Sequence, residues 1–197
     1  MLTRGCLFAT LGLLLLSSPT KAEETAKWGQ VGGWAIRVDR TVGDGCFAIQ
    51  VFERGTIVRI GFDLETKRVY FIFGHDEWKS LEEGKVYPVR MSFDGSKSYN
   101  GEMKGQRLGK VIFLAHRNVS TEFVTDFMER GGMRIFYNGS QIANLSLRNT
   151  YAAVSEMLNC QRELGFTGAT GSSGSGSSPR PADPFVSTPS RSSDPFR

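Results

Sequence analysis

Alternating apolar and polar residues predict β-strands along most of the chain. From Trp34 to Asp39, every second side chain is apolar, which is the period of a half-buried strand. Similar runs follow, separated by turns rich in Gly, Asp and Asn. They are Cys46–Phe52, Thr56–Phe62, Val69–Phe73, Val86–Phe93, Tyr99–Met103, Val111–Ala115, Met133–Tyr137 and Ile142–Leu147. We therefore expect an antiparallel sheet or sandwich of about seven or more strands.

Three of these runs carry more specific signals. Val69–Phe73 is apolar on both faces, as in a central strand. Pro88 cannot donate to a ladder, which predicts an edge strand or a bulge for its run. Asn138-Gly139 is a strong hairpin signal, because both residues adopt positive φ readily.

The period changes to that of a helix at two places. A short amphipathic helix is predicted from Thr121 to just before Gly131. A second begins at Thr150 and runs to about Leu164, with Cys160 on its apolar stripe. The predicted fold class is therefore α+β and rich in β-structure.

The ends of the chain differ from this central domain. Met1–Ala22 combines an early Arg, an apolar stretch and small residues before a cleavage point, as in a signal peptide. Its apolar stretch has about half the length needed to cross a bilayer, so a retained membrane anchor is the weaker alternative. Residues 165–197 are rich in Ser, Gly and Pro, which predicts a disordered tail. Residues 23–164 then form one globular domain, and we expect no transmembrane anchor after cleavage.

Cleavage would remove Cys6 and leave Cys46 and Cys160 as an even pair. In an oxidising compartment such a pair predicts a disulfide, which would tie an early strand to the last helix. A nucleophilic thiol is the alternative, but neither residue belongs to a Cys-x-x-Cys motif.

Composition and charge narrow the function classes. Apolar residues make up 40% of the chain, which is enough for a buried core. The net charge of +4 falls to +2 without Arg4 and Lys21 of the leader. Acidic and basic residues are interspersed, so we expect no nucleic-acid partner.

Few residues offer catalytic chemistry. His75 begins the sequence His75-Asp76-Glu77, and His116 follows another strand; either could exchange protons or bind a metal. A polar turn is the simpler interpretation of both. Paired carboxylates of the glycosidase kind would have to come from a set expected on the surface, namely Asp63, Glu65, Glu82 and Glu83. Since nucleophile-elbow and phosphate-loop motifs are absent from the domain sequence, we expect no catalytic, metal or cofactor site.

Three aromatic residues are candidate partner contacts. Trp28 precedes the first predicted strand and is the Trp with the greatest expected exposure. Phe185 and Phe196 lie in the tail, each in an Asp-Pro-Phe tripeptide. The repeat suggests docking to a protein or envelope component, although a solvated extension is the simpler interpretation.

Both ends of the domain carry a resemblance. Trp34-Ala-Ile-Arg37, Cys46-Phe-Ala-Ile-Gln50 and the segment from Leu145 to Cys160 resemble small exported bacterial proteins of the invasion-associated locus B type. The resemblance implies a periplasmic or envelope location and a non-enzymatic role. We therefore expect an exported binding protein, and the alternative is a secreted hydrolase or lyase using carboxylates with His75 or His116.

Overall fold

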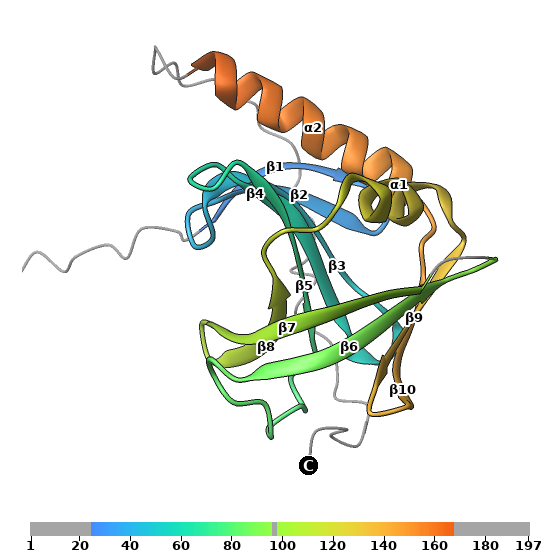
Figure 1. The fold of residues 1–197 in the computed structure, drawn as a ribbon. Coiled ribbons are helices and arrows are strands. Elements are labelled where there is room, and N and C mark those ends of the chain that lie inside the picture. The colour runs from blue at the N-terminus through green and yellow to red at the C-terminus, as the bar shows by residue number, and fades with distance from the viewer. Residues whose placement is uncertain (1–24, 96–97, 168–197) are drawn as a thin grey trace, which may run out of the picture.

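A computed structural model describes residues 25–95 and 98–167, which fold into one antiparallel sheet and two α-helices (Figure 1). The sheet has ten strands in the order β1-β2-β3-β4-β5-β8-β7-β6-β9-β10. Its first five strands are β1 (Thr25–Val31), β2 (Trp34–Asp39), β3 (Asp44–Val51), β4 (Ile57–Asp63) and β5 (Arg68–Gly74). The others are β6 (Val86–Phe93), β7 (Ser98–Leu108), β8 (Val111–His116), β9 (Gly132–Tyr137) and β10 (Ser140–Ser146). The helices are α1 (Thr121–Glu129) and α2 (Thr150–Thr167), and a single 3-10 turn spans Glu53–Gly55.

The main core lies on one face of this strongly bent sheet and is closed by the helices (Figure 1). Helix α2 packs across β1, β2 and β3, and α1 packs against α2. Aromatic rings fill the space between them: Phe71 of β5 lies 5.2 Å from Phe123 and 5.7 Å from Phe127, both of α1, between ring centroids. Trp34 of β2 contacts Phe127 edge to face at 5.8 Å. These edge-to-face contacts fix where α1 sits on the sheet.

Polar contacts also hold α1 in place. The Ser120 hydroxyl accepts a hydrogen bond from the Phe123 N–H (3.2 Å) and caps the helix. The Tyr99 hydroxyl of β7 donates to Asp126 Oδ2 (2.7 Å), which joins the helix to the sheet. Desolvation and then this hydrogen bond raise the pKa of Tyr99 to about 12.

The predicted disulfide is confirmed. Cys46 of β3 and Cys160 of α2 are bonded, and neither side chain is exposed. The Gln161 side-chain oxygen accepts the Cys46 N–H at 2.9 Å beside the bridge. A covalent bond between residues 114 positions apart thus fastens the last helix to an early strand.

Most predicted elements are confirmed, including the two-sided burial of β5 and the hairpin turn at Asn138-Gly139, where φ is 47° and 81°. The edge position predicted for Pro88 is wrong, since β6 lies between β7 and β9 with no register shift. The ladder with β9 begins only at Val89, so Pro88 lies just beyond that ladder.

Strand β1 is absent from the sequence prediction. It pairs with β2 through a register shift between Lys27 and Gly29, which interrupts the alternation of apolar residues. The predicted leader and residues 168–197 of the predicted tail lie outside the described residues, whereas residues 165–167 belong to α2. No helix in the described ranges is long and apolar enough to cross a membrane.

Candidate binding surface

His75 lies directly after β5 with only 4% of its surface exposed. Its Nδ1 lies 3.1 Å from the Glu77 backbone nitrogen and 3.0 Å from Asp76 Oδ1. Its Nε2 lies against the Arg54 carbonyl oxygen in the 3-10 turn. The ring also lies against Gly55, where an added Cβ would come within 2.7 Å of Nε2. These contacts describe a histidine that fastens two loops together.

His116, at the end of β8, is half-buried. The backbone carbonyl oxygens of Glu102 and Asn118 each lie 3.1 Å from one of its ring nitrogens. The two hollows described below do not include His75 or His116 among their lining residues.

Three of the four candidate carboxylates are ion-paired. Glu82 pairs with Lys85, and Glu83 pairs with Arg107 at 2.9 Å. Asp63, which the sequence placed at the surface, is buried; it accepts the Thr66 N–H (3.0 Å) and lies 3.4 Å from Arg117. The Thr66 N–H lowers the pKa of Asp63, the opposite of what a general acid requires.

A buried ion pair lies where the strand pattern gives no sign of burial. Arg59 of β4 occupies the sheet face opposite the main core, where alternation suggests solvent, yet it is only 6% exposed and pairs with fully buried Asp39. The Tyr70 hydroxyl accepts from Arg59 Nε (2.9 Å) and donates to Asp39 Oδ2 (3.0 Å). The guanidinium also lies 3.8 Å from the Phe47 ring centroid.

This buried cluster belongs to a second, smaller apolar core on the outer face of the sheet. Burial lowers the pKa of Arg59 and raises that of Tyr70. Neither of the two hollows is lined by Arg59, Asp39 or Tyr70. In the cluster Arg59, Asp39 and Tyr70 satisfy one another inside the fold, and it is not offered to a ligand in either hollow.

Trp28 is half-buried in β1 and is not part of an exposed approach segment. Its indole N–H donates to Glu156 Oε1 of α2 (3.2 Å), and its ring packs against the main core. Contact of Trp28 with a partner stays a prediction. Phe185 and Phe196 lie outside the described residues.

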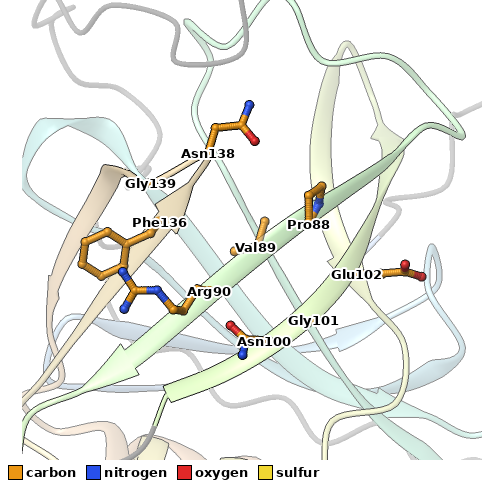
Figure 2. Close-up of a pocket in the computed structure, with 9 residues that line it drawn as sticks. All are labelled: Pro88, Val89, Arg90, Asn100, Gly101, Glu102, Phe136, Asn138 and Gly139. Carbon is orange, nitrogen blue, oxygen red and sulfur yellow. The ribbon is translucent and has the colours of Figure 1, made fainter.

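A groove of about 530 Å³ lies on the outer face of β6, β7 and β9 (Figure 2). Its lining residues are Pro88–Arg90 of β6, Asn100–Glu102 of β7, Phe136 of β9 and the turn Asn138-Gly139. Alternation explains the arrangement: Tyr87, Val89, Met91 and Phe93 bury their side chains in the core, so the residues between them project outward. A second, smaller hollow beside it is lined by residues that include Lys104, Gln106 and Arg117.

The groove combines opposite charges with an aromatic surface. The Arg90 guanidinium lies 3.9 Å from the Phe136 ring centroid (Figure 2). Arg90 and Glu102 are exposed, and neither takes part in an ion pair among the described residues. The side chains of Asn100 and Asn138 add hydrogen-bond donors and acceptors. Such a surface suits a ligand that carries both charged and apolar groups.

Sequence reasoning missed this groove because its residues come from three strands. Arg90 faces Asn100 on one side and Phe136 on the other, and only the strand order β7-β6-β9 brings them together. The one available signal was the polar face of the run Val86–Phe93. Among residues 25–95 and 98–167, no group of three or more His, Cys, Asp or Glu side chains could hold a metal ion.

Comparison with solved structures gives a fold likeness. The crystal structure of invasion associated protein B from Bartonella henselae matches 68% of this chain and 97% of its own chain, with a TM-score of 0.50 and 12% sequence identity. This chain shares the fold of invasion associated protein B. The resemblance drawn from both ends of the sequence is thus confirmed at the level of fold. No family model matches the sequence, and no curated protein matches it significantly.

The shared region is almost the whole of invasion associated protein B. Since the match covers 68% of this chain, about a third of the sequence has no counterpart in it. At 12% identity the likeness assigns no functional residues, so the groove must be interpreted from its own chemistry.

Proposed function

We propose that this chain is an exported, non-enzymatic binding protein of the bacterial cell envelope, periplasmic or secreted. Its partner would be a protein or another envelope component. The observation that carries the proposal is the buried Cys46–Cys160 bridge. Disulfides form and persist in oxidising compartments and are rare in the cytosol, so a bridge built into the core points to an exported protein.

Two further observations support this location. Met1–Ala22 has the charge, apolar stretch and small residues of a secretory leader. The chain also shares its fold with a protein named for an association with invasion. A role outside the cytoplasm agrees with that name.

Binding rather than catalysis is favoured by where the polar groups lie. Both ring nitrogens of His75 are engaged with backbone groups, whereas a general base must reach a substrate proton. The exposed Arg90 and Glu102 instead lie in an open groove with polar and aromatic surfaces. Their arrangement suits reversible recognition.

The location is tested by fusing residues 1–30 to alkaline phosphatase, an enzyme that requires its own disulfides to be active. We expect phosphatase activity in a Gram-negative host, because the leader carries the reporter into an oxidising compartment. The matched control is Leu14→Arg, which places a charge in the apolar stretch and should abolish activity. An inactive wild-type fusion, or an equally active Leu14→Arg fusion, would contradict export through this leader.

A further inference from the structure

We propose that the groove on β6, β7 and β9 binds the Asp-Pro-Phe segments of this chain's own C-terminal tail, Asp183–Phe185 and Asp194–Phe196. The proposal rests on the proposed function, because it takes the same groove as the binding surface. If the tail occupies the groove, any external ligand that binds there must compete with the tail.

The order of charges in the tail complements the order of charges in the groove. An Arg stands three positions before each of these Asp residues, so the repeated unit is Arg-x-x-Asp-Pro-Phe, beginning at Arg180 and again at Arg191. Across the groove, Glu102 of β7 is followed by Arg90 of β6 and then by Phe136 of β9 (Figure 2). A bound segment could therefore place its Arg at Glu102, its Asp at Arg90 and its Phe ring at Phe136.

The repeated unit is long enough to span the groove. Glu102 is paired with Pro88 and Phe136 with Arg90, so Glu102 and Phe136 stand two strands apart and are offset by two residues along the strands. With about 4.8 Å between strands and about 3.4 Å per residue, their backbones are roughly 12 Å apart. Five fully extended steps from Arg to Phe cover roughly 17 Å, so a bound segment would be less than fully extended. The space above Gly101 is free for a bound segment, since a Cβ added there would meet no atom within 4 Å.

The tail is long enough to reach the groove from the end of α2. Helix α2 ends at Thr167, and Asp183 follows 16 residues later. At about 3.3–3.6 Å per residue this is roughly 50 Å of chain, whereas a domain of this size has a radius of gyration of about 14 Å. Tethering also supplies a high effective concentration, commonly millimolar, so even a weak site would be occupied.

The test is paramagnetic relaxation in the chain from Glu23 to Arg197 with its bridge oxidised, because residues 1–22 carry Cys6. A nitroxide is attached through Ser187→Cys, between the two Asp-Pro-Phe segments; Cys46 and Cys160 are buried and bonded to each other, so they do not compete for the label. We expect the amide signals of Gly101 and Gly139, which line the groove, to lose intensity. Phe185→Ser with Phe196→Ser should restore them. Unchanged signals in the labelled chain would overturn the proposal.

The control variants separate specific binding from general attraction. Arg90→Glu should abolish the intensity loss, whereas Arg134→Glu, an equal charge change on exposed β9 surface outside the groove, should leave it. Equal effects of the two variants would contradict the assigned pairing.

A mixture of two chains tests whether the tail binds its own groove or that of another copy. One chain carries the nitroxide and no ¹⁵N, and the other carries ¹⁵N and no nitroxide. We expect no intensity loss in the mixture, because each groove holds its own tail; loss there would mean binding between copies and would overturn the proposal. The phosphatase fusion does not depend on the groove, so failure of tail binding and failure of export are distinguishable.

Discussion

Replacing both Cys46 and Cys160 with Ala is expected to lower the free energy of unfolding by about 4–5 kcal/mol. The bridge closes a loop between residues 114 positions apart, and the chain-entropy model assigns that cost to the greater freedom of the unbridged unfolded chain. Native domains are stable by only about 5–15 kcal/mol, so the loss removes a large share of the total. Urea denaturation of the oxidised protein and of the double variant measures it.

Reduced wild-type protein is the control for lost packing. It lacks the bond but keeps both buried sulfur atoms, so its difference from the double variant reports the cavity left by Ala. We expect the reduced protein to show most of the destabilisation. A double variant within about 1 kcal/mol of the oxidised protein would contradict the importance given to the bridge.

Asp39→Asn is expected to destabilise the domain by about 3–5 kcal/mol, because it leaves the Arg59 guanidinium buried without its counter-charge. Asn keeps the size of the side chain and an oxygen that can still accept the Thr41 N–H. Chemical denaturation is again the measurement. Tyr70→Phe, which removes one hydroxyl and leaves both charges, should cost less, about 1–2 kcal/mol.

The double variant Asp39→Asn with Arg59→Met separates the charge effect from loss of packing. Met fills part of the space of the Arg stem and carries no charge, so the pair of substitutions should cost less than Asp39→Asn alone. If the losses in the free energy of unfolding caused by the two substitutions simply add, the stabilising role assigned to the buried ion pair is wrong.

The alternation of apolar residues predicted much of this fold because it reflects a physical constraint on each strand separately. The run Val86–Phe93 buries every second side chain as expected, and Asn138-Gly139 forms the turn that its positive φ angles require. The Cys46–Cys160 bridge followed from the two cysteines that remain when Cys6 of the predicted leader is set aside.

What sequence reasoning missed depends on contacts between distant strands. Arg59 has the sequence signature of a solvent-facing residue, and only Asp39, Tyr70 and Phe47 from neighbouring strands explain its burial. The groove likewise requires the strand order β7-β6-β9, which periodicity does not encode. Strand β1 was not predicted, because a register shift interrupts the alternation of apolar and polar residues along it.

The most direct test of the central claim, an exported and disulfide-tied binding protein, is the intact mass of the chain recovered from its native host without reducing agent. We predict the mass of Glu23–Arg197 less two hydrogen atoms, because the leader is removed and the Cys46–Cys160 bond is formed. The mass of the whole chain from Met1 with free thiols would contradict export, and with it the proposed function.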